Sequence, residues 1–187
     1  SQEAFIKALI QAKEAKLSRL YVYGKQELAY TKTLTELFET SLADIQEAYV
    51  EAFALKDQFL IASINETYGA IYGYLHDYEK SIEYYQRALD AYQHLNYPAH
   101  VAEAVYGLAS TYRYWKKYDL AIEYFEKYQQ QTGYTPNSNL SFFSAYGIGM
   151  TLAEKGDCVE AITTIDKALA LKGVVDYNAE LYKRKAS

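Results

Sequence analysis

Tyr68-Gly69-Ala70-Ile71-Tyr72 is the stretch that decides the fold, because its pattern recurs along the chain. The same positions read Leu108-Ala109-Ser110-Thr111-Tyr112 forty residues later, and Ile148-Gly149-Met150-Thr151-Leu152 after forty more. Forty residues before the first stretch stands Leu28-Ala29-Tyr30-Thr31-Lys32. The register needs no insertion or deletion, and a fixed period of this size predicts a solenoid.

Each repeat carries two apolar stripes that are separated by a short break. In the second repeat the first stripe consists of Ile64, Tyr68, Ile71, Tyr72 and Leu75. The second stripe consists of Tyr78, Ile82, Tyr85, Ala88, Leu89 and Tyr92. Spacings of three and four residues put each stripe on one face of an α-helix. The sequence therefore predicts one antiparallel helix pair per repeat.

Two positions hold a small residue in every repeat. They are occupied by Ala29, Gly69, Ala109 and Gly149 in the first stripe, and by Ser41, Ser81, Ala121 and Ala161 in the second. Small side chains let two helices approach closely. Glycine inside a helix costs about 1 kcal/mol relative to alanine, so Gly69 and Gly149 are expected to be contact points rather than helix breakers. We expect Ala121 and Gly149 to be nearly inaccessible.

The pattern predicts helices at about 2–16, 20–35, 38–55, 59–75, 78–95, 99–115, 118–131, 138–154, 158–171 and 176–186. They form one solenoid over residues 1–187, with four full repeats at approximately 20–57, 58–97, 98–137 and 138–172 and half repeats at 2–16 and 176–186. Asp77 and Asp157 stand where N-caps are expected, as does Asn137 or Ser138. Half repeats should leave apolar faces open, which favours a fragment of a larger protein over a naturally short one and makes end-to-end self-association possible.

The repeat resembles the tetratricopeptide repeat (TPR) family, whose motif reads Trp-x2-Leu-Gly-x2-Tyr, then Ala-x3-Phe, Ala and Pro. Leu108-Ala109-x2-Tyr112 with Ala121-x3-Phe125 is the best copy, followed by Tyr68-Gly69-x2-Tyr72 with Ser81-x3-Tyr85. The proline is absent, the period is forty rather than ~34, and the tryptophan position holds Lys25, Asn65, Val105 and Ala145. The resemblance implies an all-α, right-handed TPR-like α-solenoid of antiparallel helix pairs with a 40-residue period.

Composition excludes several classes of function. Half of the residues are apolar and 23% are charged, so the chain is expected to fold. The net charge of −5 comes without a basic stripe, so we expect no nucleic-acid partner. The sequence holds no apolar run of 18 residues or more, so we expect no membrane insertion by this chain.

The sequence predicts neither a catalytic constellation nor a metal site, and we expect no enzyme activity and no cofactor. The histidines fall at helix ends, without a second His, Cys or carboxylate at ligand spacing on the same face; they are His76, His94 and His100. The single cysteine, Cys158, occupies a slot that aromatic residues fill in the other repeats. We therefore expect Cys158 to be a buried packing residue rather than a nucleophile.

In TPR folds the first helix of each pair lines a concave groove. Projection of the register onto that face gives the candidate ligand- or peptide-binding residues Tyr23, Tyr30, Glu66, Tyr74, Glu103, Tyr106, Arg113, Tyr114, Phe143 and Tyr146. The clamp with which some family members hold an acidic chaperone tail needs Lys and Asn at positions that here hold Gln26, Glu66, Tyr106, Tyr146, Tyr30, Ala70, Ser110 and Met150, so that clamp is not expected.

Tyrosine offers a large contact area with a hydrogen-bonding tip, which suits recognition of a protein, a peptide or a small ligand. Two alternatives stay open. Most of the 22 tyrosines could pack between repeats instead. Arg113 could pair with a neighbouring carboxylate such as Glu66 or Glu103 rather than with a ligand.

The leading hypothesis is a non-catalytic interaction or ligand-sensing module of a larger bacterial signalling protein. Residues 41–49, 134–139 and 178–186 resemble TPR sensor regions that precede GGDEF diguanylate cyclase domains in gammaproteobacteria. That resemblance implies a membrane-anchored protein with this module in the periplasm. The alternatives are the cytoplasmic receptor region of a peptide-pheromone regulator and a structural adaptor scaffold.

Overall fold

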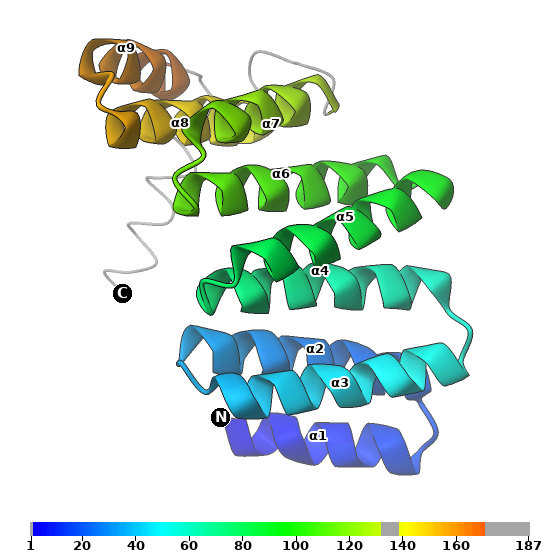
Figure 1. The fold of residues 1–187 in the computed structure, drawn as a ribbon. Helices are drawn as coiled ribbons and strands as arrows, with labels where there is room; N and C mark the ends of the chain where they lie inside the picture. Colours follow the sequence, from blue (N-terminus) through cyan, green and yellow to red (C-terminus); the bar gives the residue numbers. More distant parts are fainter. Residues whose placement is uncertain (1, 132–138, 171–187) are drawn as a thin grey trace. The chain divides into compact units, whose positions relative to one another are not determined.

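The computed structural model describes residues 2–131 and 139–170, which form α-helices and contain no strand (Figure 1). The helices are α1 (Gln2–Glu14), α2 (Ser18–Leu34), α3 (Phe38–Ala54), α4 (Gln58–Tyr74), α5 (Tyr78–His94), α6 (Pro98–Tyr114), α7 (Tyr118–Gln131), α8 (Asn139–Lys155) and α9 (Cys158–Leu169). The all-α prediction is confirmed, and each of these helices overlaps its predicted range. The helix expected at 176–186 and the caps expected at Asn137 or Ser138 lie outside the described residues.

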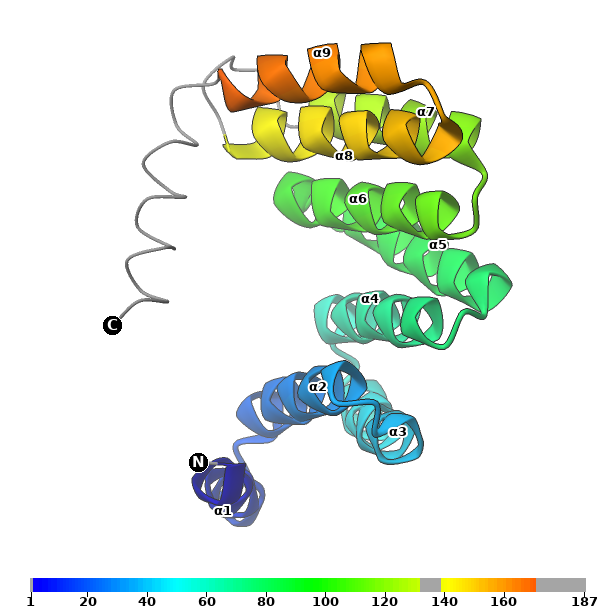
Figure 2. The same ribbon diagram turned by 90° about the vertical axis from the view of Figure 1, so that its left-hand side faces the viewer.

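The chain divides into two compact units, residues 1–100 and 101–187, and α6 runs through the boundary. In the first unit α2 packs against α1, α3 and α4, and α4 packs against α3 and α5. In the second unit α8 packs against both α7 and α9, and both views show these three helices side by side (Figures 1 and 2). No helix in the described part of the chain has both the length and the apolar character needed to span a membrane.

The connections between helices repeat one turn geometry. The residue with positive φ recurs every twenty positions, at Lys16, Glu36, Lys56, His76, Asn96 and Lys116, and again at Gly156. In the turn after α2, the Leu37 N–H donates to the Lys32 carbonyl at 2.9 Å and the Glu36 N–H donates to the Thr33 carbonyl at 3.0 Å. These two bonds define the Schellman motif, which satisfies carbonyls at a helix end. The same turn at the joints that the structure describes keeps those helix starts in register.

Replacement of Lys56 or Lys116 by glycine should stabilise the protein by about 0.5–1 kcal/mol per site. A non-glycine side chain in the left-handed region destabilises the folded state by about 1–2 kcal/mol. Glycine removes that cost, but its greater freedom in the unfolded chain offsets about 0.5–1 kcal/mol of the gain. Urea unfolding measures the gain. Asn96→Gly is the matched control, because asparagine tolerates positive φ and should gain less. An equal gain at Asn96, or none at Lys56 and Lys116, would contradict the assigned turn.

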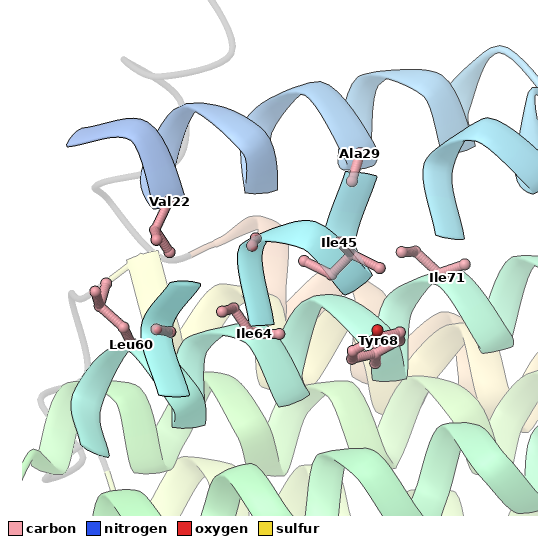
Figure 3. Packing of buried hydrophobic residues seen from close by; sticks show 9 residues of the cluster. Val22, Ala29, Ile45, Leu60, Ile64, Tyr68 and Ile71 are labelled. Carbon is pink, nitrogen blue, oxygen red and sulfur yellow. The ribbon is translucent and has the colours of Figure 1, made fainter. Parts of the chain in front are cut away.

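The apolar stripes form the core, as predicted. In the first unit they build a cluster between α2, α3 and α4, which Figure 3 shows from close by. Its members include Val22 and Ala29 from α2, Ile45 from α3, and Leu60, Ile64, Tyr68 and Ile71 from α4. In the second unit Ala109, Ala121 and Phe125 form the centre of a cluster between α6 and α7.

The eight small positions are all buried, so the prediction of close helix approach is confirmed, including Ala121 and Gly149. A Cβ atom on Gly69 would lie 2.7 Å from the Tyr85 ring, and one on Gly149 would lie 2.5 Å from Ile165. The small residue of the second helix also bonds the first, since the Ser81 hydroxyl donates to the Gly69 carbonyl at 2.8 Å. Larger residues at these points would force the paired helices apart.

The Lys25 side chain, which stands at the tryptophan position, belongs to an ionic network between α2 and α3. Its Nζ atom lies 2.7 Å from Asp44 and 2.8 Å from Glu47, and Lys32 Nζ lies 2.5 Å from the other Asp44 oxygen. The Lys25 and Asp44 side chains are only 14% and 11% exposed. Hydrogen bonds from Lys25, Tyr21 and Lys13 lower the pKa of the Glu47 carboxyl to about 2.

Two expectations need correction. Cys158 is exposed, whereas the aromatic residues at the same first position of α3, α5 and α7 are half-buried. The cysteine side chain is too short to cover the surface that an aromatic ring covers. Asp157 stands at the N-cap of α9 but its side chain makes no capping bond; its carboxylate lies 3.6 Å from Lys155 Nζ instead. Asp77 does cap α5, and Asp57, which sequence reasoning missed, caps α4.

α1 leaves Phe5, Ile6 and Ile10 exposed, and apolar exposure was expected for the half repeat at 2–16. Self-association through this face stays a prediction.

Candidate functional site

The ten candidate residues fall into two groups, one in each unit. The α2/α4 face consists of Tyr23, Tyr30, Glu66 and Tyr74. The α6/α8 face consists of Glu103, Tyr106, Arg113, Tyr114, Phe143 and Tyr146.

The α6/α8 face displays aromatic rings to solvent. Tyr114, Tyr146 and Phe143 are 57%, 41% and 37% exposed, whereas Tyr106 is half-buried. The Tyr106 ring meets Phe125 of α7 edge-on at 5.5 Å and Phe143 of α8 at 6.5 Å between centroids. Tyr106 therefore connects the exposed rings to the core of the unit.

Arg113 ties α6 to α8. Its Nη1 atom lies 2.9 Å from the Glu154 carboxylate, and its guanidinium lies 4.7 Å from the centre of the Tyr114 ring. The expectation that Arg113 pairs with a carboxylate is met by Glu154, which was not among the suggested examples. Glu154 is the actual partner because the helix one repeat further on brings it opposite Arg113. The guanidinium thereby has a fixed position beside an exposed ring.

Several groups of the second unit shift the pKa of the Tyr106 phenol. Burial raises the pKa of the Tyr106 phenol. The Arg113 charge and a hydrogen bond with Ser110 act in the opposite direction, whereas Tyr114 and Tyr146 raise the pKa further. Arg113, Tyr114 and Tyr146 thus contribute to the electrostatic environment of Tyr106, and their convergence on one groove stays a prediction. Tyr74, which was expected to join them, belongs to the first unit.

The α2/α4 face combines exposed tyrosines with one carboxylate. Tyr23, Tyr30 and Tyr74 are exposed, and half-buried Glu66 accepts a hydrogen bond of 2.9 Å from the Tyr92 hydroxyl. Gln26 joins the two helices, since its Nε2 atom donates to the Ser63 hydroxyl at 2.9 Å and to the Thr67 hydroxyl at 3.3 Å.

Tyr85 of α5 packs against α4, as sequence reasoning expected. Its ring lies against Gly69, which has no side chain to block it. Burial raises the pKa of the Tyr85 phenol, and the neighbouring Glu66, Tyr30 and Tyr74 raise it further. The equivalent positions in the other repeats hold Ile45, Phe125 and Ile165, so Tyr85 is the one of these four residues with a hydroxyl.

The histidines need one correction. His100 stacks on Tyr92 at 4.9 Å and meets Phe59 edge-on at 5.0 Å. Glu103 follows His100 by three residues on α6, and residues at this spacing are neighbours on a helix surface. The expectation that no histidine has a carboxylate at ligand spacing was therefore wrong.

Comparisons with known proteins show which family model this sequence resembles. Residues 60–130 match the family model of the tetratricopeptide repeat. No curated protein matches the sequence.

Several solved structures share the fold at low sequence identity. BtubC (BKLC) from P. vanneervenii is 19% identical, with a TM-score of 0.75 over 91% of this chain and 71% of that one. A putative kinesin light chain of Podosopora anserina with nearly identical TPR-like repeats is 13% identical, with a TM-score of 0.71 over 94% and 88%. A Rap protein complexed with Competence and Sporulation Factor is 19% identical, with a TM-score of 0.73 over 98% of this chain and 51% of that chain, so this chain spans about half of the Rap protein. The chain thus shares the fold of these solved structures, and its residues 60–130 match the tetratricopeptide repeat model.

Proposed function

We propose that the chain is a non-catalytic recognition module that binds a peptide or protein segment on the α6/α8 face. The observation that carries the proposal is the exposure of Tyr114, Phe143 and Tyr146 on the same two helices as half-buried Tyr106, whose ring lies 6.5 Å from that of Phe143. Rings with a buried base and a solvated tip supply much contact area with little loss of side-chain freedom, and aromatic residues dominate the binding energy of interfaces.

Arg113 contributes a fixed positive group to the same face. Its side chain is only 16% exposed and is held by Glu154 and the Tyr114 ring. A fixed side chain loses less conformational entropy when a ligand binds. A ligand carboxylate near Arg113 competes with Glu154, so the rings supply most of the affinity and Arg113 sets the orientation of the ligand.

The Rap protein with the same fold, which was solved in complex with Competence and Sporulation Factor, supports recognition as the general role. We propose further that the module belongs to a larger bacterial signalling protein, with the sensor region of a GGDEF diguanylate cyclase as the first candidate. A peptide-pheromone receptor region and a structural adaptor are the alternatives. A transmembrane segment with a GGDEF domain in the full-length gene supports the first, a helix-turn-helix supports the second, and neither supports the third.

A random linear peptide library, selected on the immobilised protein, tests the proposed face. Selected peptides are labelled, and fluorescence anisotropy gives their Kd for the wild type and for Tyr146→Ala and Phe143→Ala. Loss of an aromatic contact at the centre of an interface costs more than ~1.4 kcal/mol, so each substitution should weaken binding about tenfold or more.

Ile162→Ala is the matched control, because Ile162 lies on α9 outside this face and is 61% exposed. It should leave the Kd unchanged, and the helical circular dichroism of all three variants should match that of the wild type. Selected peptides that bind Tyr146→Ala and Phe143→Ala with the wild-type Kd would show that the α6/α8 face is not the site.

A further inference from the structure

One histidine stands where packing alone would place an apolar residue. The other repeats hold leucine at the position of His100, namely Leu20, Leu60 and Leu140, and Leu60 is fully buried in the core of the first unit. His100 lies in the first turn of α6 and is half-buried. Burial of a polar group is unfavourable unless the group has polar partners, so His100 indicates a polar role at this position.

Two carboxylates lie beside His100. Glu66 comes from α4, whereas Glu103 follows His100 by three residues on the continuous helix α6, which places the two side chains next to each other. A ring nitrogen of His100 and one carboxylate oxygen each of Glu66 and Glu103 all lie within 4.8 Å of one another. Spacing along one helix could not reveal this group, because Glu66 lies on a different helix.

Tyr92 of α5 holds two members of this group in place. Its hydroxyl donates to Glu66 Oε2 at 2.9 Å, and its ring stacks on the His100 ring with 4.9 Å between centroids. Phe59 meets the His100 ring edge-on at 5.0 Å. Tyr92 is fully buried, so the carboxylate and the imidazole are both supported from the core. Such supporting contacts orient the side chains that bind a metal and raise its affinity.

The donor atoms select the class of ion. Imidazole nitrogen suits Zn²⁺ and related transition-metal ions, whereas Ca²⁺ and Mg²⁺ take oxygen ligands. A histidine and a carboxylate three residues apart on one helix also bind metal in helical bundles. Zinc bonds to nitrogen and oxygen are about 2.0–2.2 Å long, so the ligand atoms of one ion lie about 3–4 Å apart, and a movement of about 1 Å per side chain gives this spacing.

We propose that Glu66, His100 and Glu103 bind a divalent transition-metal ion of the zinc type. The ion links α4 to α6, and its positive charge offsets the negative charges of the two carboxylates. Three protein ligands leave a coordination position for water or for a group of another molecule. This inference goes beyond the proposed recognition role and does not depend on it, because metal binding here needs no peptide.

Isothermal titration calorimetry of the tag-free protein with zinc chloride tests the site. We expect one Zn²⁺ ion per chain, and no binding of Mg²⁺ or Ca²⁺ at the same concentrations. Loss of a group that orients a metal ligand weakens binding about 10–100-fold, so Tyr92→Phe should have an effect of this size. His100→Phe keeps a ring on Tyr92 but removes the nitrogen, and Glu66→Gln keeps an acceptor for the Tyr92 hydroxyl but removes the charge. Both should weaken Zn²⁺ binding at least about tenfold.

His94→Gln is the matched control, because His94 is an exposed histidine at the end of α5 and is not a member of this group. It should leave the affinity for Zn²⁺ unchanged, and the helical circular dichroism of every variant should match that of the wild type. Equal weakening in His94→Gln and His100→Phe would show binding by surface histidines and overturn the inference. Unchanged affinity in Glu66→Gln, or no Zn²⁺ binding by the wild type, would also overturn it.

Discussion

Asp44→Ala should destabilise the first unit by about 3–5 kcal/mol, because it removes the carboxylate that Lys25 and Lys32 share. Lys25 keeps Glu47 at 2.8 Å, whereas Lys32 loses its ion pair with Asp44. Asp44 receives Lys25 on one carboxylate oxygen and Lys32 on the other. The Asp44 and Lys25 side chains are largely withdrawn from water, so solvent cannot replace the lost partner. Chemical denaturation that is followed by circular dichroism measures the change in the free energy of unfolding.

Glu83→Ala is the control for this prediction. Glu83 also forms an ion pair, with Arg87 one turn away on α5, but both side chains are more than half exposed. An exposed pair of this spacing contributes only about 0.3–0.5 kcal/mol. If Asp44→Ala costs no more than Glu83→Ala, the network between α2 and α3 is not buried in solution.

Phe125→Ala should destabilise the second unit by about 3–5 kcal/mol, the range for loss of a buried aromatic side chain. Phe125 is 1% exposed, and its ring fills the space beside Gly147, where a Cβ atom would lie only 2.5 Å away. The variant also removes the ring that supports Tyr106, so it should weaken ligand binding at the α6/α8 face. Thermal unfolding measures the first effect, and the Kd of library-selected peptides measures the second.

Phe143→Ala is the matched control for stability, since it removes the same side chain from a partly exposed position of the same unit. Its cost should be within about 1 kcal/mol, because the ring keeps much of its surface in water. Similar losses of stability in the two variants would contradict the packing of Phe125 between α6, α7 and α8.

The helices could be predicted from the sequence because their determinants are local. Apolar residues at spacings of three and four placed the stripes, and the small residues at positions such as Gly69 and Ala121 marked where helices meet. The partners of polar side chains could not be predicted in this way, because they depend on how helices from different repeats pack. Arg113 meets a carboxylate 41 residues away, and no pattern within one repeat distinguishes Glu154 from the nearer Glu103.

The sequence by itself determined the all-α fold, the core faces and the tyrosine-rich character of the first helices, because hydrophobic periodicity and side-chain volume act within a repeat. Only the tertiary structure decided which polar groups share a surface. It brought the Tyr92 hydroxyl of a second helix to Glu66, left the Gln26 oxygen without a donor among the described residues, and exposed Cys158 at the start of α9. These outcomes depend on how neighbouring helices pack, which fixes distances between residues that lie far apart in the chain.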